Sequence, residues 1–224
     1  MGILTGNALK LIAAASMLLD HMGLMLFPGN LLLRIIGRLA MPIYAFMIAE
    51  GCKYTRSKSR YFGMVFSLAA VCQTVYFLFD GSTYLSILFT FSLSIGTIYA
   101  LHRYQANPGV ATGALFALAV AGVYLLNRIF TIDYGFWGCM LPVFPAMLHG
   151  TAYDRQPWNM AMLGLGMVLL SANVGGIQFF SLAALPLLLL YSGRRGKWNM
   201  KYFFYIFYPV HLVLLEGIAM LMRQ

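Results

Sequence analysis

Long apolar stretches alternate with short polar clusters along the whole chain. Gly, Pro, Asn, Asp and Ser gather in the polar clusters, as they do in the turns between helices. Each apolar stretch is close to the length of a transmembrane helix, and nine occur, at about residues 8–27, 33–51, 61–79, 84–101, 110–126, 134–149, 158–173, 177–192 and 202–222. The pattern predicts an all-α, polytopic helical membrane protein with about nine transmembrane helices. Residues 1–224 are expected to form a single integral membrane domain.

The sixth, seventh and eighth stretches differ from the others because they are short and rich in Gly and Pro. Irregular backbone at membrane depth is tolerated only where protein or a cavity surrounds it. We therefore expect one of these three stretches to be kinked or re-entrant. We expect the first stretch to be kept as a helix and not removed as a signal peptide, because further apolar stretches follow it.

Composition supports a membrane protein and explains the charge. Of the 224 residues, 61% are hydrophobic and 9% are charged, which excludes a water-soluble fold of this size. The net charge of +9 arises from basic residues between apolar stretches, so we interpret it as a topology signal and not as a nucleic-acid surface. A cytoplasmic N-terminus leaves only Arg34, Arg38, Arg128 and Arg223 on the outer side of a cytoplasmic (inner) membrane. It places eleven basic residues inside: Lys10, Lys53, Arg56, Lys58, Arg60, Arg103, Arg155, Arg194, Arg195, Lys197 and Lys201.

The first apolar stretch carries three ionisable residues at a meaningful spacing. His21 follows Lys10 by eleven positions, and eleven helical steps return to within about 20° of the starting direction while rising about 16 Å. A cation near one membrane surface therefore shares a helix face with a buried imidazole. Asp20 lies at nearly the same depth, and such residues within a membrane are costly unless they are paired or functional. The spacing predicts a catalytic site inside the membrane.

Further polar residues fall on the outer side of the predicted topology and are candidates for the same site. Arg34 and Arg38 are one helical turn apart, Asp133 begins the sixth stretch, and His211 lies near the middle of the ninth. The alternative is structural. Asp20 or Asp133 would neutralise an arginine and hold helices together, and His211 would satisfy the backbone next to Pro209.

On the inner side, two basic clusters and Lys10 suggest a site for a polyanion. Glu50, Lys53 and Arg56 form one cluster, and Arg194, Arg195 and Lys197 form the other. The alternative is that these clusters only set topology and attract anionic lipid. The histidines are scattered and the three cysteines lack ligand spacing, so no metal site is expected.

Several motifs together resemble the TraX family, whose name comes from the enzyme that acetylates the N-terminus of conjugative F pilin. They are Leu4-Thr5-Gly6-Asn7 with Lys10, Asp20-His21-Met22-Gly23, Arg34-Ile35-Ile36-Gly37-Arg38-Leu39-Ala40-Met41-Pro42, Glu50-Gly51, Asp133-Tyr134-Gly135, Tyr191-Ser192-Gly193-Arg194-Arg195-Gly196, and Phe204-Tyr205-Ile206-Phe207-Tyr208-Pro209-Val210-His211-Leu212. The wider group of acyltransferase-3-type membrane enzymes carries a basic residue, ten intervening positions and a His in the first helix. Lys10 and His21 match that spacing.

The resemblance implies an acyl-CoA-dependent acyltransferase with acetyl-CoA as co-substrate. His21 would be a general base or a nucleophile, Asp133 would hold its tautomer, and Asp20 would orient Arg34 or Arg38, which stabilise the thioester oxyanion. His211 would line the acceptor side. The expected cofactor-binding residues are Lys10, Glu50, Lys53, Arg56, Tyr208, Arg194, Arg195 and Lys197.

Two other functions remain open at this stage. A transporter or flippase would use the same buried His, Asp and Arg residues as a proton or anion relay, although no internal duplication is seen in the sequence. An integral scaffold would use the buried charges only to pair helices. The acceptor, a pilin-like peptide or an envelope glycan, and the oligomeric state are not specified by the sequence.

Overall fold

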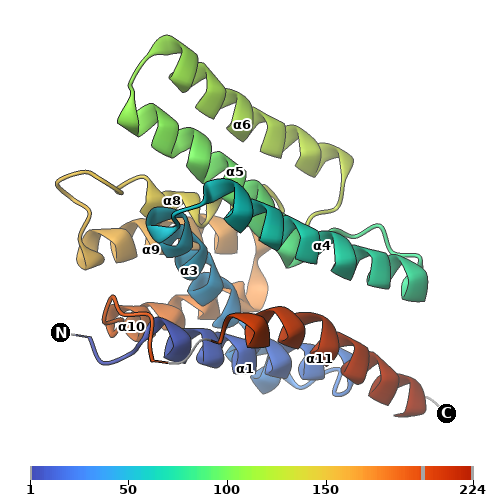
Figure 1. Ribbon diagram of the computed structural model, residues 1–224. Helices are drawn as coiled ribbons and strands as arrows, with labels where there is room; N and C mark the ends of the chain where they lie inside the picture. Colours follow the sequence, from blue (N-terminus) through green and yellow to red (C-terminus); the bar gives the residue numbers. More distant parts are fainter. Residues whose placement is uncertain (1, 198–199, 223–224) are drawn as a thin grey trace. The chain divides into compact units, whose positions relative to one another are not determined.

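The computed structural model describes residues 2–197 and 200–222, and about 77% of it is helical with no strand among these residues (Figure 1). Arg223 lies outside the described residues. The elements, in chain order, are α1 (Gly6–Met25), α2 (Leu31–Gly37), α3 (Ala40–Tyr54), α4 (Lys58–Asp80), α5 (Ile87–Ala106), α6 (Val110–Ile129), α7 (Gly135–Met140), α8 (Val143–Ala146), α9 (Gln156–Val174), the 3₁₀ helix η1 (Gly176–Ala183), α10 (Ala184–Leu189) and α11 (Lys201–Met222).

Each of the nine predicted stretches overlaps helical structure. Six helical segments among the described residues are long and apolar enough to cross a membrane: 6–25, 31–54, 58–78, 110–129, 156–174 and 203–222. The sixth and eighth stretches are shorter and broken, the sixth into α7 and α8 and the eighth into η1 and α10. The second stretch is also interrupted, between α2 and α3. The chain is therefore an all-helical protein with the helices of a multi-pass membrane protein.

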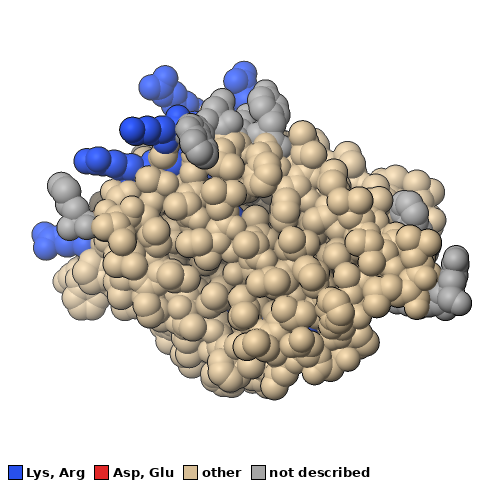
Figure 2. Space-filling view, turned by 90° about the horizontal axis from the view of Figure 1, so that it is seen from below, with Lys and Arg blue, Asp and Glu red and all other residues tan. Residues whose placement is uncertain are grey.

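Large apolar side chains are exposed to a degree that suits lipid and not water. On α6, Leu118 is 69% exposed and Leu125 is 59% exposed. Figure 2 shows a face on which uncharged side chains predominate and no acidic side chain is visible. Large apolar side chains exposed to this degree would make a soluble monomer aggregate, whereas lipid tails cover them at no cost.

The described chain divides into two compact units, which are treated separately. The first comprises Met1–Met47 and Val174–Gln224, and the second comprises Ile48–Asn173. In the first unit, α1 packs against α2 and α11, and η1 packs against α2 and α10 (Figure 1). Two ends of the sequence thus meet in one bundle.

A loop from the second half of the chain caps the start of α1. The Thr5 hydroxyl accepts a hydrogen bond from Ala8 N (3.2 Å). Gly6 N and Asn7 N donate to the backbone oxygens of Arg194 (2.8 Å) and Arg195 (3.0 Å). These contacts satisfy N–H groups that a helix start otherwise leaves without a partner.

The same loop is anchored by a short parallel pairing. Leu4 N donates to Leu190 O (2.8 Å), and Ser192 N donates to Leu4 O (2.8 Å). Gly196 has φ +102°, and a methyl group there would lie 3.0 Å from the Asn7 amide. Glycine readily adopts this backbone conformation, and its lack of a side chain lets the loop approach Asn7 closely. Residues 190–196 hold the N-terminus of α1 in place.

In the second unit, α5 packs against α4, α6, α7 and α8. Its buried hydroxyls bond to carbonyls one turn earlier: Ser94 Oγ donates to Thr90 O (2.9 Å) and lies 2.7 Å from Cys139 O, next to α7. Thr97 Oγ1 similarly donates to Leu93 O (3.0 Å). Small side chains whose hydroxyl groups donate to the backbone of their own helix let apolar helices approach closely.

Candidate functional site

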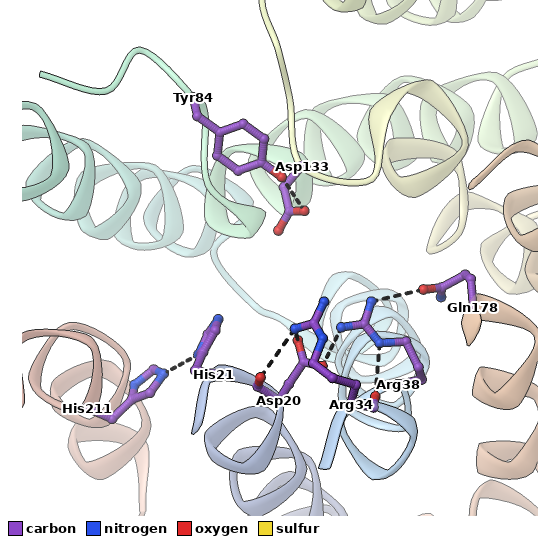
Figure 3. Close-up of polar contacts among 8 residues, drawn as sticks. All are labelled: Asp20, His21, Arg34, Arg38, Tyr84, Asp133, Gln178 and His211. Atoms are coloured by element: carbon purple, nitrogen blue, oxygen red, sulfur yellow. Dashed lines mark hydrogen bonds and ion pairs between the residues drawn. The ribbon is translucent and has the colours of Figure 1, made fainter. Parts of the chain in front are cut away.

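A hydrogen-bonded pair of histidines, the histidine dyad, joins α1 and α11 (Figure 3). His21 Nδ1 lies 2.8 Å from His211 Nε2, and the second ring nitrogen of His211 lies 2.8 Å from Phe207 O. His211 is 4% exposed, and its ring stacks on Phe207 at a centroid distance of 4.8 Å. Tyr208 packs edge-on against the same imidazole and is also buried. Two residues 190 positions apart thus form one polar unit.

Asp20, next to His21, faces α2 and not α11. Its carboxylate pairs with Arg34 Nη1 (2.9 Å) and with Arg38 Nη2. Neighbouring residues on a helix point about 100° apart. Anchoring Asp20 to α2 therefore directs His21 towards α11.

The two arginines are held differently. Arg38 uses all three of its guanidinium nitrogens: Nη2 on Asp20, Nη1 on Gln178 Oε1 (3.2 Å) and Nε on Arg34 O (3.3 Å). Arg34 makes both of its contacts through Nη1, to the carboxylate and to the backbone oxygen of Asp20 (3.2 Å). Among the described residues, Nε and Nη2 of Arg34 have no hydrogen-bond partner. Arg38 is therefore held at all three guanidinium nitrogens, whereas Arg34 is held at one.

Asp20, Arg34, Arg38 and Gln178 form a group that we call the arginine cluster. Two glycines make room for it between the helices. A methyl group on Gly37 would overlap the Asp20 carboxylate, and one on Gly23 would lie 3.2 Å from Arg34 Cδ. Their absence of a side chain lets α1 and α2 come close enough for direct ion pairs.

The cationic end of the first unit lies about three helical turns from the dyad. Lys10 is on the same helix face as His21, because both residues contact α11: Lys10 Nζ lies 5.9 Å from the centre of the Phe204 ring. The capping loop exposes the side chains of Arg194, Arg195 and Lys197. The loop presents carbonyls to α1 and charged side chains to its surroundings.

The predicted residues of the second unit have other neighbours. Lys53 forms an ion pair with Asp154 (2.8 Å), and Asp154 also accepts hydrogen bonds from Gly150 N and Asn159 Nδ2 (both 3.1 Å). Burial opposes it, but the hydrogen bonds from Lys53 and Asn159 hold the pKa of Asp154 below its usual value. The Lys53 ion pair therefore connects α3 to the loop before α9. Glu50 is half-buried near this pair, and Arg56 is exposed.

Asp133 forms a short hydrogen bond with a tyrosine of its own unit (Figure 3). The Tyr84 hydroxyl donates to Asp133 Oδ1 at 2.6 Å, and Thr90 Oγ1 donates to Asp133 O at 2.8 Å. Burial and the negative charge of Asp133 raise the pKa of Tyr84. The next residue, Tyr134, adopts a left-handed conformation (φ 58°) that Gly138 accommodates, because a side chain there would overlap Tyr134. The Asp-Tyr-Gly motif thus builds a tight turn.

A second histidine pair lies in the second unit. His102 Nε2, near the end of α5, is 3.1 Å from His149 Nδ1, in the loop after α8. Burial, followed by the charges of His102 and Lys53, lowers the pKa of His149 to about 4, with Asp154 opposing the shift. This pair joins the loop to α5.

Most predicted site residues collect in the first unit. Those residues are Lys10, Asp20, His21, Arg34, Arg38, Arg194, Arg195, Lys197, Tyr208 and His211, and the second unit holds Glu50, Lys53, Arg56 and Asp133. Among the described contacts, the partner of His21 is His211. The role of Asp133 in holding the His21 tautomer stays a prediction.

Sequence reasoning missed Gln178 and Phe207. Gln178, on η1, is 1% exposed and fixes Arg38. A polar residue inside a short apolar stretch was the available signal. No signal identified Phe207, which acts through its backbone oxygen and its ring.

A family model described as TraX protein matches residues 5–219. The chain belongs to the TraX family. This match spans nearly the whole chain, including both helices of the dyad and the capping loop.

The TraX-family chain also has curated relatives. It is 27% identical to the "Probable fimbrial assembly protein FimC, serogroup H1" of Dichelobacter nodosus, with 96% of each protein covered. It is 41% identical over 54 residues to an uncharacterized protein of Rickettsia prowazekii (strain Madrid E), covering 24% of the chain and 21% of that protein. No solved structure matches the TraX-family chain.

The first prediction concerns Gly37→Ala. Alanine is the better helix former by about 1 kcal/mol, yet its methyl group would overlap Asp20 and break the ion pairs with both arginines. We expect a loss of about 2–4 kcal/mol of unfolding free energy, measured by thermal unfolding in detergent. Gly63→Ala is the matched control, because nothing lies within 4 Å of its added methyl group. Equal stability of the two variants would contradict the proposed close approach.

The second prediction concerns acid sensitivity at His149. Between pH 6.5 and about 4 the unfolded chain binds a proton at this position and the folded chain does not. Stability therefore falls as the pH falls through this window, by about 1–3 kcal/mol. Asp154 has a lowered pKa and acts only below about pH 4, outside the window. His149→Gln should reduce the difference in unfolding midpoint between pH 7 and pH 5, and an unchanged difference would contradict the assignment.

Proposed function

We propose that this protein is a membrane-embedded acetyltransferase that moves an acetyl group from acetyl-CoA to an acceptor amine or hydroxyl. The observation that carries the proposal is the geometry of His21. Its Nδ1 is occupied by His211, while its other ring nitrogen, Nε2, has no partner among the described residues and points away from His211 (Figure 3). A positioned imidazole with one free nitrogen is the usual form of a general base.

The cationic end of the first unit supports a CoA thioester as donor. CoA has an anionic head and a long flexible arm, so its phosphates and its thioester are bound at separate places. Arg194, Arg195 and Lys197 are exposed on the loop that caps α1, and Lys10 lies about one turn after the first residue of that helix. His21 is a further 16 Å or so along it. One helix thus connects a polyanion site with the base.

The reaction follows from these positions. The acceptor amine or hydroxyl attacks the thioester carbonyl carbon and loses its proton to Nε2 of His21. The carbon–sulfur bond breaks, and the CoA thiolate takes that proton, which returns the imidazole to its starting form. The products are the acetylated acceptor and CoA thiol, with no proton left over.

The arginine cluster supplies charge to this reaction through one of its two arginines. Arg34 has free Nε and Nη2 donors, so it is the residue that stabilises negative charge on the thioester oxygen. Arg38 has a protein partner on each of its three guanidinium nitrogens and instead positions Asp20. Arg34 and Arg38 both pair with Asp20, the residue next to His21.

Family and relatives favour an acceptor of the pilin kind. The TraX family is associated with acetylation of F pilin, and the relative that covers 96% of the chain is described as a fimbrial assembly protein. With nine crossings, the N-terminus in the cytoplasm and the protein in the inner membrane, acetyl-CoA reaches Lys10 from the cytoplasm. The acceptor, a pilin-like peptide or an envelope glycan, then reaches His21 from the other side.

The third prediction tests the base. In nanodiscs containing the purified protein, His21→Ala should reduce transfer from labelled acetyl-CoA to the free amine of tri-alanine by at least 100-fold. CoA binding, measured by calorimetry, should stay within threefold of wild type. N-acetylated tri-alanine is the control acceptor. Full activity of the variant, or loss of its CoA binding, would show that His21 is not the general base. His21 would then have another role, such as part of a relay in a transporter.

The fourth prediction tests the donor site. Replacing both Arg194 and Arg195 by Gln should weaken CoA binding about tenfold or more, because each arginine–phosphate contact contributes about 1.5–3 kcal/mol in a favourable geometry. The turnover rate at saturating acetyl-CoA should change little. Arg60→Gln with Arg103→Gln removes the same charge from exposed positions in the second unit. If both double variants bind CoA like wild type, the Arg194 pair is a topology signal only.

A further inference from the structure

The hydrogen bonds of the dyad define which nitrogen of each ring carries a proton. Phe207 O can only accept a hydrogen bond, so Nδ1 of His211 carries the proton between them (2.8 Å). In a neutral ring, Nε2 of His211 then carries a lone pair and accepts a hydrogen bond from Nδ1 of His21 (2.8 Å). Nδ1 of His21 is therefore protonated, and Nε2 of His21 is unprotonated. The backbone of α11 thus sets the tautomer of a residue on α1.

We propose that His211 is a proton-relay partner of His21, so that the charge formed during acetyl transfer is shared between two imidazoles. This inference rests on the proposed acetyltransferase function. When Nε2 of His21 takes the acceptor's proton, the Nδ1 proton of His21 moves to Nε2 of His211. It returns when Nε2 of His21 gives its proton to the departing thiolate. Each nitrogen ends as it began.

The charges around the dyad explain why sharing is useful. Arg34 and Arg38 both lie against Asp20, the residue next to His21, and the Asp20 carboxylate is already paired with both. A positive charge confined to His21 is therefore repelled. His211, on α11, lies on the far side of His21 from the two arginines (Figure 3). Passing the proton to His211 moves the charge away from the guanidinium groups.

The surroundings of His211 are suited to a transient cation. Phe207 contributes its carbonyl to Nδ1–H and the face of its ring, which is within 10° of parallel to the imidazole. Carbonyl and ring both stabilise a positive charge in a low-dielectric site. This arrangement does the work that a carboxylate does in a Ser-His-Asp triad, without adding a full negative charge to the membrane interior.

The tautomer is tested first, because it needs no activity. Nitrogen NMR shifts of ¹⁵N-histidine protein in lipid separate protonated from unprotonated ring nitrogens, and the chain has only four histidines to assign. We expect Nδ1 of His21 to be protonated and Nε2 to be unprotonated near pH 7.5. A proton on Nε2 of His21 overturns the relay whether or not the acetyltransferase proposal holds.

The relay itself, the fifth prediction, is tested with His211→Gln. The glutamine oxygen can accept from His21 and keep its tautomer, but it cannot take the proton. We expect acetyl transfer to tri-alanine to fall 10- to 100-fold, with CoA binding unchanged. The solvent isotope effect should change from a curved dependence on deuterium content, which indicates two moving protons, to a linear one.

His149→Gln is the matched control, since it alters the other histidine pair, and it should leave the rate within twofold of wild type. Wild-type turnover by His211→Gln would show that His211 only orients His21, and would overturn the relay. If wild-type protein transfers no acetyl group although the tautomer is as expected, the acetyltransferase proposal fails and the relay fails with it. Unfolding midpoints show whether each variant has folded. If His211→Gln has not folded, His211→Asn is used in its place.

Discussion

The paired charges of Asp20 with Arg34 and Arg38 are the interaction on which the site depends. Breaking such a pair in an apolar bundle leaves an uncompensated charge, so it fixes the distance and rotation of α1 against α2. Because His21 follows Asp20 directly, that rotation also turns the imidazole towards α11. Gly37 and Gly23 belong to the same constraint, since neither ion pair forms unless the two helices touch.

The opposite end of α1 is held by backbone, not by charge. Residues 190–196 pair with Leu4 and cap Gly6 and Asn7, and the chain then continues from this loop into α11. The loop therefore sets the starting point of α1, the helix that carries His21. Its arginines contribute carbonyls to this cap while their side chains stay exposed, so the structural role leaves both side chains available for the phosphate binding that we propose.

Much of the fold was predictable because apolar length is a local property of the sequence. All nine predicted stretches overlap helices. Two of the three short, Gly- and Pro-rich stretches, the sixth and the eighth, are each divided into two shorter helices. The start of α5 fell a few residues later than predicted because Leu85 pairs with the backbone of residues 131–133, a contact far away in sequence. The spacing of Lys10 and His21 correctly placed both residues on one face of α1, but it could not identify the partner of His21. That partner lies 190 residues away, and Gln178 was equally out of reach.

In the proposed relay, a second imidazole takes the place that a carboxylate has in many enzymes, and this suits the charge balance of the unit. Asp20 is already shared by two guanidinium groups, and a further buried carboxylate beside His21 would compete for Arg34. A neutral imidazole imposes no such competition. It also has a proton acceptor on one side and a donor on the other, so it can hold a tautomer at rest and receive a charge during reaction. The resting site then stays free of an additional buried ion, which is the costliest element to place in a membrane protein.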